Sequence, residues 1–149
     1  MDSIKKVSVV MCTCNGEKFV KEQLDSIINQ TYPLHEIIIQ DDNSHDNTIE
    51  ILEEYAKKDK RIHVYHNVPA LGVNQNFFAG IKKTTGDFIA LSDQDDIWEL
   101  NKIELQMQAI GDKLLCSGLS KPFSYDDCYV SFDDRPINFN PIRTIFAGV

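Results

Sequence analysis

The chain has 149 residues, of which 42% are hydrophobic and 26% charged, and this suits one globular domain with a hydrophobic core. Its formal net charge of −8 argues against nucleic-acid binding, because proteins of that class present a basic face to the phosphates. No apolar run approaches the length of a membrane span, and the run near the N-terminus is too short for a signal peptide.

Strand and helix patterns alternate along most of the chain. Runs of β-branched and apolar residues predict buried strands over 6–13, 35–42 and 87–93. Alternating residues over 61–67 predict a strand nearer a sheet edge, and 113–120 is a candidate for a fifth strand.

Apolar residues at helical spacing predict four helices between these strands, over 15–33, 44–59, 73–86 and 98–111. We expect the first helix to begin at Asn15 and the second to be entered through Ser44 or Asp46, as N-cap residues. Ile49 and Leu100 are assigned to the inner faces of their helices. Such an order predicts an α/β fold, a mostly parallel sheet with helices on both faces.

Polar residues follow three of the predicted strands, in the stretches 12–17, 40–44 and 92–98. If these strands are neighbours, the three loops share one edge of the sheet, where open parallel sheets bind ligands. The first loop has one glycine and matches neither the dinucleotide-binding pattern nor the P-loop. A glycine-rich cradle for a diphosphate is therefore not expected, and a divalent metal is the remaining device for holding one in an acidic site.

Asp93 and Asp95 are the candidate metal ligands. They stand two residues apart directly after a predicted strand, and residues at that spacing on an extended segment point to the same side. Mg²⁺ and Mn²⁺ prefer oxygen ligands, and a bound cation would relieve the repulsion between neighbouring carboxylates.

Four ordered stretches, 7–32, 36–52, 72–81 and 86–98, resemble the nucleotide-sugar half of the family 2 glycosyltransferases, which have the GT-A fold. The "SDQDDIW" form of the last stretch is similar to the rhamnosyltransferase-like branch. The resemblance implies a Rossmann-like nucleotide-sugar-binding domain over 1–120. It also implies that 121–149 begins an acceptor-side region that is incomplete in this chain.

The same resemblance implies a set of site residues. The residues implied to contact the nucleotide sugar are Cys12, Thr13, Cys14, Glu17, Asp42, Asn76 and Asp93, and those implied to hold the metal are Asp95 and Asp93. Asp42 matches the base-binding aspartate, and Asn76 falls in a segment near the base. Cys14 stands where the family usually has an aromatic residue, so stacking on the base is lost or supplied elsewhere.

Simpler structural roles stay open for several of these residues. Asp42 and Ser44 also fit a turn and a cap, and Cys12 and Cys14 fit small strand residues better than a metal pair. Asp96 is a weak candidate for the catalytic base and equally a candidate N-cap for the next helix. Four further residues are given structural roles: Asp41, Trp98 as a packing anchor, and Phe77 and Phe78 in the core.

The function implied by the resemblance is metal-dependent, inverting transfer of a sugar to a hydroxyl group. The donor would be a UDP- or dTDP-linked sugar, and the acceptor a saccharide or a lipid-linked saccharide in cell-surface polysaccharide synthesis. The alternative is a catalytically incomplete nucleotide-sugar-binding module or fragment. A nucleotidyltransferase is disfavoured, since no Gly-rich loop with a Lys or Arg lies near the first strand.

The expected location is the cytoplasm, or the cytoplasmic face of the membrane. The four cysteines lack paired C-x-x-C spacing, which fits reduced thiols. The basic run 57–61 is interpreted as a solvated helix end, although a peripheral membrane contact stays open.

Overall fold

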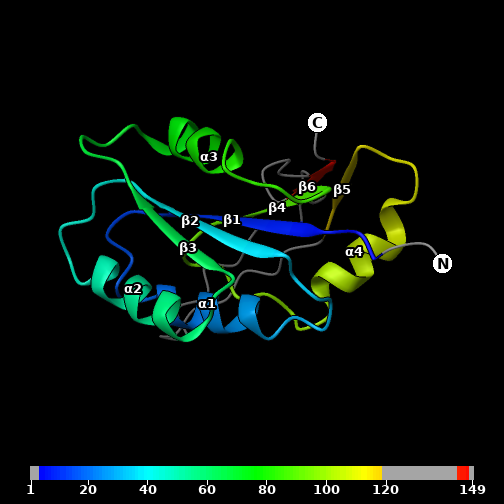
Figure 1. Cartoon of the computed structure of the whole chain (residues 1–149), viewed down its shortest axis with the longest axis horizontal. Helices are drawn as coiled ribbons and strands as arrows, with labels where there is room; N and C mark the ends of the chain where they lie inside the picture. The colour runs from blue at the N-terminus through cyan, green and yellow to red at the C-terminus, as the bar shows by residue number, and fades with distance from the viewer. Residues whose placement is uncertain (1–3, 119–143, 148–149) are drawn as a thin grey trace, which may run out of the picture.

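The computed structural model of the chain describes residues 4–118 and 144–147. Within these residues the strands are β1 (Val7–Thr13), β2 (Glu36–Asp41), β3 (Ile62–His66), β4 (Phe88–Ser92), β5 (Leu115–Ser117) and β6 (Thr144–Ala147). The helices are α1 (Val20–Ile28), α2 (Thr48–Lys58), α3 (Val73–Ile81) and α4 (Lys102–Ile110) (Figure 1). Most of the predicted acceptor-side region, 121–149, lies outside the described residues.

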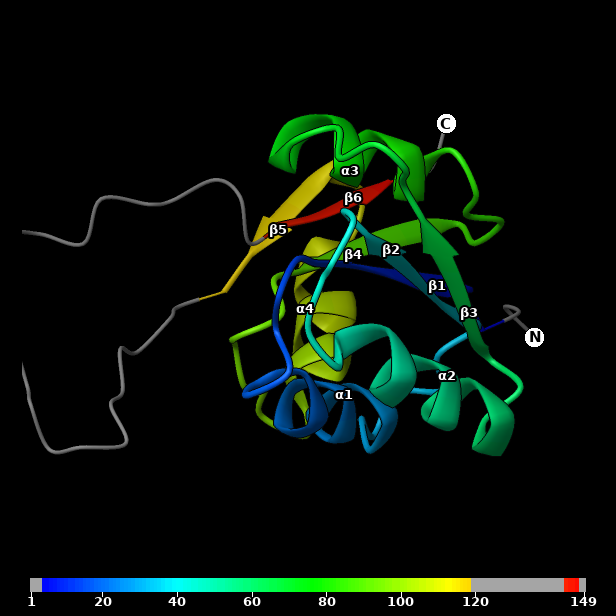
Figure 2. The same cartoon turned by 90° about the vertical axis from the view of Figure 1, so that its left-hand side faces the viewer.

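One sheet holds all six described strands, in the order β3-β2-β1-β4-β6-β5. β1 pairs in parallel with β2 and β4, β2 pairs in parallel with β3, and β6 pairs antiparallel with β4 and β5. α1, α2 and α4 cover one face and α3 covers the other (Figure 2). The predicted mostly parallel α/β sheet, with β3 at an edge, is confirmed.

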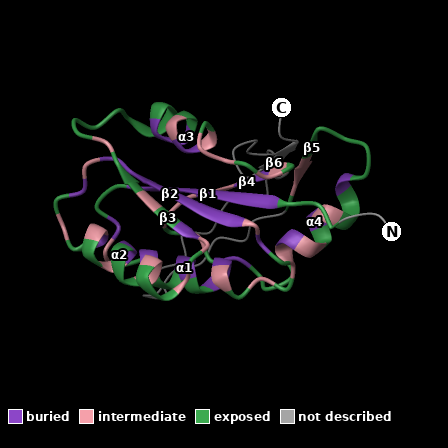
Figure 3. Cartoon of the chain, in the orientation of Figure 1, coloured by how far each residue is buried: buried purple, intermediate pink, exposed green. Residues whose placement is uncertain are grey.

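The core lies on both faces of β1 and β2, because every residue of these two strands is buried (Figure 3). Side chains alternate between the faces, so Val9 and Met11 pack with α1 while Val10 and Cys12 pack under Phe77 of α3. α3 approaches the sheet closely at Gly80, where an added Cβ would lie 2.6 Å from Val10 Cγ1.

The helix starts differ from the sequence prediction. α1 begins at Val20 rather than Asn15, since Asn15 has a left-handed φ of 49° and its Oδ1 accepts the His45 N–H. α2 begins at Thr48, and Asp46 Oδ1 accepts the Thr48 N–H, so Asp46 does assist the helix start.

The predicted inner faces of two helices also need correction. Thr48 is fully buried in the first turn of α2, while Ile49 is only half-buried. Leu100 precedes α4 and is 56% exposed, so its assignment to an inner face is wrong. The Leu100 carbonyl accepts the N–H of Thr31, so this residue links the segment before α4 to the loop that follows α1.

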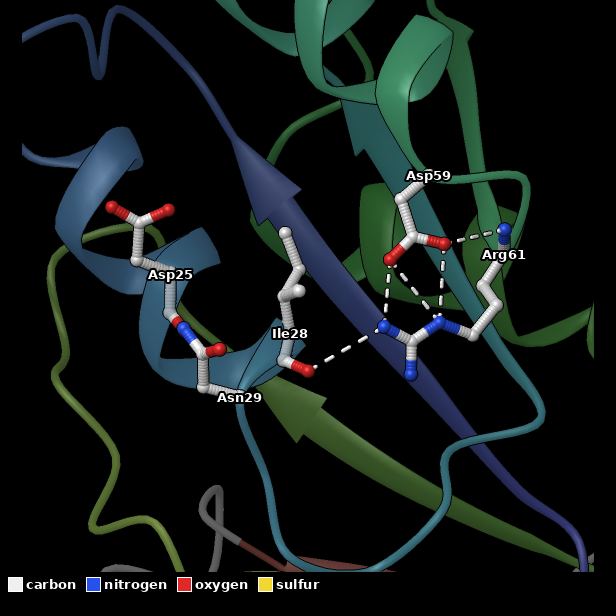
Figure 4. Close-up of polar contacts among 5 residues, drawn as sticks. All are labelled: Asp25, Ile28, Asn29, Asp59 and Arg61. Carbon is white, nitrogen blue, oxygen red and sulfur yellow. Dashed lines mark hydrogen bonds and ion pairs between the residues drawn. The ribbon is translucent and has the colours of Figure 1, made fainter.

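Arg61 ties the end of α1 to the turn between α2 and β3 (Figure 4). Its Nη2 lies 2.6 Å from Asp59 Oδ2 and also donates to the carbonyl of Ile28, at 3.4 Å. The hydrogen bond to Arg61 holds the pKa of Asp59 below its ordinary value. Among the described residues, no helix has the length and apolarity needed to cross a membrane.

Candidate functional site

Three polar loops meet at the carboxyl-terminal edge of the central strands. β2, β1 and β4 are adjacent and parallel, with Thr13 paired to Asp41 and Met11 to Ser92. We call the segments that follow them the β2 exit loop (residues 42–47), the β1 exit loop (residues 14–17) and the acidic loop (residues 93–96). Their expected meeting at one edge is confirmed.

Side chains of neighbouring segments accept hydrogen bonds from the main-chain N–H groups of the β1 exit loop. Its four consecutive N–H groups donate to Gln94 Oε1 (from Cys14, 2.8 Å), Ser44 Oγ (from Asn15, 2.8 Å), Thr48 Oγ1 (from Gly16, 2.8 Å) and Asp46 Oδ2 (from Glu17, 3.1 Å). These four N–H groups already have hydrogen-bond acceptors within the protein. A diphosphate at this edge would therefore need other groups to hold it.

Two adjacent carboxylates at the end of β2 have different surroundings. Asp41 is fully buried and accepts hydrogen bonds from Thr13 Oγ1 at 2.7 Å and from the N–H and Oγ of Ser44 at 2.9 and 2.6 Å. Its predicted structural role and the turn role of Ser44 agree with these contacts. Thr13 is thereby committed to Asp41, and it lies buried beneath the site.

Asp42 points instead toward the loop between β3 and α3. Its carboxylate accepts the N–H groups of Leu71 at 2.7 Å and Gly72 at 2.8 Å, and Nδ2 of Asn67 at 2.9 Å. Burial opposes ionisation of Asp42, but these donors outweigh burial and hold its pKa below the ordinary value. The carboxylate is thus kept ionised, with its orientation fixed by three donors.

Asn67 joins Asp42 to Asn76. Its Nδ2 also donates to Asn76 Oδ1 at 2.7 Å, and its Oδ1 accepts from Gln40 Nε2 at 2.9 Å. The buried Asn76 in turn donates to the Gln40 carbonyl at 2.8 Å. Two site residues from the resemblance therefore lie in one network, whereas Asn67 was missed; its position at the polar end of a strand was the available signal.

Cys12 lies between the two ends of the candidate site. The thiol is buried, and burial raises its pKa, with further contributions from the negative charges of Asp93 and Asp42. Both carboxylates therefore act on the same sulfur, from opposite sides of β1. Cys14 is exposed, and its Sγ lies 3.6 Å from the Asp42 carbonyl.

Glu17 binds the start of α2. Its Oε2 accepts the N–H of Asn47 at 3.0 Å and the side-chain amide of Asn47 at 2.9 Å. The carboxylate therefore fixes the β1 exit loop against the β2 exit loop.

The acidic loop is not extended, contrary to the geometry assumed for Asp93 and Asp95. β4 ends at Ser92, and Gln94 and Asp95 form a turn, so the argument from alternation does not apply. Asp93 is half-buried near Cys12, and Asp95 is exposed. Asn101 is the N-cap of α4, so the alternative role of Asp96 as that N-cap is wrong.

Buried contacts from α1 fix both ends of the acidic loop. Gln23, which is fully buried, donates through Nε2 to Ser92 Oγ, and Ser26 Oγ accepts the Trp98 N–H at 3.0 Å. Trp98 is 5% exposed and belongs to the core, as the predicted packing anchor, with Lys102 Nζ 3.6 Å from its ring centroid. Of the two phenylalanines assigned to the core, Phe77 is buried but Phe78 is 57% exposed.

The donor set at the acidic loop fits a hard divalent cation. Asp93 and Asp95 offer only oxygen ligands, the type that Mg²⁺ and Mn²⁺ prefer. Within residues 4–118 and 144–147 there is no cluster of three or more His, Cys, Asp and Glu side chains that could hold a metal alone. Mg²⁺ sites that serve nucleotides use one or two carboxylates, with water and phosphate oxygens completing the shell. Two carboxylates are therefore enough for a cation that arrives with a diphosphate.

A family model described as "Glycosyl transferase family 2" matches residues 8–139. The chain belongs to this family. An uncharacterized glycosyltransferase of Haemophilus influenzae is 40% identical over 104 residues, which are 70% of this chain and 32% of that protein. The Escherichia coli UDP-Glc:alpha-D-GlcNAc-diphosphoundecaprenol beta-1,3-glucosyltransferase WfgD is 37% identical over 101 residues, which are 68% of this chain and 39% of that protein.

Solved structures agree with the family. The crystal structure of S. aureus TarS 1–349 in complex with UDP-GlcNAc superposes with a TM-score of 0.68 at 26% identity, over 80% of this chain and 37% of that one. The GT-A fold expected from the sequence is thus confirmed. The chain spans 32% and 39% of the lengths of the two relatives named above.

Proposed function

We propose that this chain binds a nucleoside-diphosphate sugar at the edge formed by the three exit loops, as the donor half of a metal-dependent glycosyltransferase. The observation that carries the proposal is that β2 and β4 flank β1, so that Asp42 and Asp93, which follow the ends of these two strands, lie at one edge of the sheet. An oriented carboxylate for the base and acidic side chains for a cation at the diphosphate are thereby proposed to lie at the same edge of the sheet.

In this proposal Asp42 accepts an N–H of the base, since its carboxylate is ionised and oriented by Leu71, Gly72 and Asn67. Asp95 and Asp93 hold the cation. When bound, the metal neutralises negative charge that builds on the leaving diphosphate.

Cell-surface glycan synthesis is the proposed setting, with a saccharide or lipid-linked saccharide as acceptor. Supporting this are the UDP-linked donor and the diphosphoundecaprenol-linked acceptor named for the E. coli relative, and the UDP-GlcNAc bound by TarS. UDP is therefore the first nucleotide to test, with dTDP beside it. The proposed location is the cytoplasmic face of the membrane. An inverting reaction would need a carboxylate to deprotonate the acceptor hydroxyl, and Asp96 stays a candidate for that base.

Isothermal titration of the chain with UDP, dTDP and GDP, each with and without Mn²⁺, tests donor binding. We expect saturable binding of UDP or dTDP that strengthens with Mn²⁺, and no metal-dependent binding to any nucleotide would contradict the proposal. Donor turnover with a mixture of saccharide acceptors then separates a transferase from the alternative, a module that binds the donor without transferring the sugar.

A further inference from the structure

We propose that Gln94 is a positioning residue that holds the acidic loop against the β1 exit loop, so that metal and nucleotide strengthen each other's binding. The inference rests on the proposed function, because it concerns how the two halves of that site are joined. Gln94 stands between the two candidate metal ligands, and neither the sequence motifs nor the family comparison assigns it a role.

The side-chain amide of Gln94 pairs with the main chain of a single residue. Its Oε1 accepts the N–H of Cys14 at 2.8 Å, and its Nε2 donates to the Cys14 carbonyl at 3.0 Å. Two hydrogen bonds to one residue fix both the position and the rotation of the amide, as in a hydrogen-bonded residue pair between two β-strands. Gln94 thereby links two loops that are 80 positions apart in sequence.

Gly16 provides the space for this contact. A Cβ built on Gly16 would lie 2.2 Å from Gln94 Oε1 and 2.7 Å from Cδ, and the three nearest heavy atoms all belong to Gln94. Gly16 is also buried, and its N–H is held by Thr48 Oγ1, so the backbone has little room to retreat. The single glycine of the β1 exit loop thus serves the Gln94 contact rather than a phosphate cradle.

The contact extends a line of hydrogen bonds across the site. On its other side the β1 exit loop is held by Ser44, Thr48 and Asp46 of the segment after β2, next to Asp42. Gln94 joins the acidic loop to the β1 exit loop. It therefore connects the part of the site that contains Asp42, the proposed base-binding residue, with the part that contains the proposed metal ligands. Both ligands can stabilise a hydrogen-bonded connection of this kind, and in that way each can strengthen the binding of the other.

UDP titrations with and without Mn²⁺ measure the coupling as the ratio of the two affinities. For Gln94→Ala we expect UDP affinity without metal to be retained, because the β2 exit loop still holds the base side. The Mn²⁺-dependent enhancement should fall by about tenfold, a coupling of ordinary size. Gln94→Glu should lose at least as much, because a carboxylate oxygen would then face the Cys14 carbonyl.

Gln30→Ala is the matched control. Its side-chain amide also makes two hydrogen bonds to main-chain groups, donating to the Glu99 carbonyl at 2.8 Å and accepting the Ile103 N–H at 3.0 Å. These contacts lie outside the three loops of the candidate site. We expect this variant to lose stability and keep the Mn²⁺-dependent ratio. A Gln94→Ala ratio equal to that of the wild type would overturn this inference alone, whereas a wild type that shows no metal-dependent binding of any nucleotide would overturn the proposed function as well.

Gly16→Ala tests the same contact without touching a polar group. The added methyl displaces the Gln94 amide, so we expect the same loss of the ratio as in Gln94→Ala. In the Gln94→Ala background the methyl meets an emptied space, so Gly16→Ala should have little further effect. Additive losses in the double variant would contradict the assigned contact, and circular dichroism of each variant confirms that it is folded.

Discussion

Identical side chains serve different purposes at the end of β2. Asp41 lies fully buried and binds Thr13 and Ser44, whereas Asp42, one position later, faces the β3–α3 loop. The sequence predicted a structural role for Asp41, whereas the base-binding role of Asp42 is implied by the family resemblance and stays a prediction. Asn67 lies at the polar end of a strand, which placed it near the same edge, but its contact with Asp42, 25 positions away, was not readable from sequence.

Asn67→Ala tests the orientation of Asp42. The change removes a donor to Asp42 Oδ1 and leaves Asn76 and Gln40 without their shared partner. We expect UDP affinity to fall about tenfold, equivalent to about 1.4 kcal/mol. His63→Ala, an exposed change on the neighbouring β3, is the control, and equal affinities of the two variants would show that Asn67 does not organise the base end.

Whole elements act through the hydrogen bonds at their ends. α1 reaches the acidic loop through Gln23 and Ser26, and it reaches the turn before β3 through the Ile28 carbonyl. The apolar face of α1 was predictable from its spacing. Its start was not, because the conformation of Asn15 is decided by the contact with His45 in the β2 exit loop.

Gln23→Leu should destabilise the fold through the link between α1 and β4. Gln23 is fully buried, and an apolar replacement leaves the Ser92 hydroxyl without this partner. Because Ser92 Oγ still donates to the Asp93 carbonyl at 2.9 Å, we expect the free energy of unfolding to fall by about 1 kcal/mol, the net contribution of one buried hydrogen bond. Urea unfolding measures it against Lys21→Ala, an exposed change on the same helix, and equal midpoints would refute the role of the link.

Asp59→Asn should alter how stability depends on pH. Arg61 lowers the folded-state pKa of Asp59, so ionised Asp59 stabilises the fold at neutral pH, and this contribution is lost as the pH falls below the ordinary pKa of the residue. Because the pair is partly exposed, we expect a difference of about 0.5 kcal/mol at pH 7. Thermal unfolding from pH 7 to pH 3 should show the difference between wild type and variant shrinking. A constant difference would contradict it.

For the complete fold, hydrophobic patterns predicted the order of strands and helices, and parallel pairing predicted the shared edge of the three loops. Two features of the fold could not be predicted from the sequence. The turn at Gln94 and Asp95 is accompanied by a contact with Cys14, 80 positions away in sequence, and β6 lies between β4 and β5 through pairing of distant segments. Local patterns specify elements, whereas the loops that build the candidate site are shaped by contacts across the sheet edge.

We propose that Asp93 and Asp95 hold a divalent cation that secures the diphosphate of a nucleotide. Electron paramagnetic resonance of Mn²⁺ tests it most directly, since the signal of free Mn²⁺ is lost on binding. We expect the wild-type chain with UDP to remove this signal in a saturable titration, and Asp95→Asn and Asp93→Asn to abolish the effect. Asp112→Asn, an exposed acid paired with Lys113 away from the site, should bind like the wild type. Undiminished Mn²⁺ binding by the Asp93 and Asp95 variants would show that these carboxylates do not hold the cation.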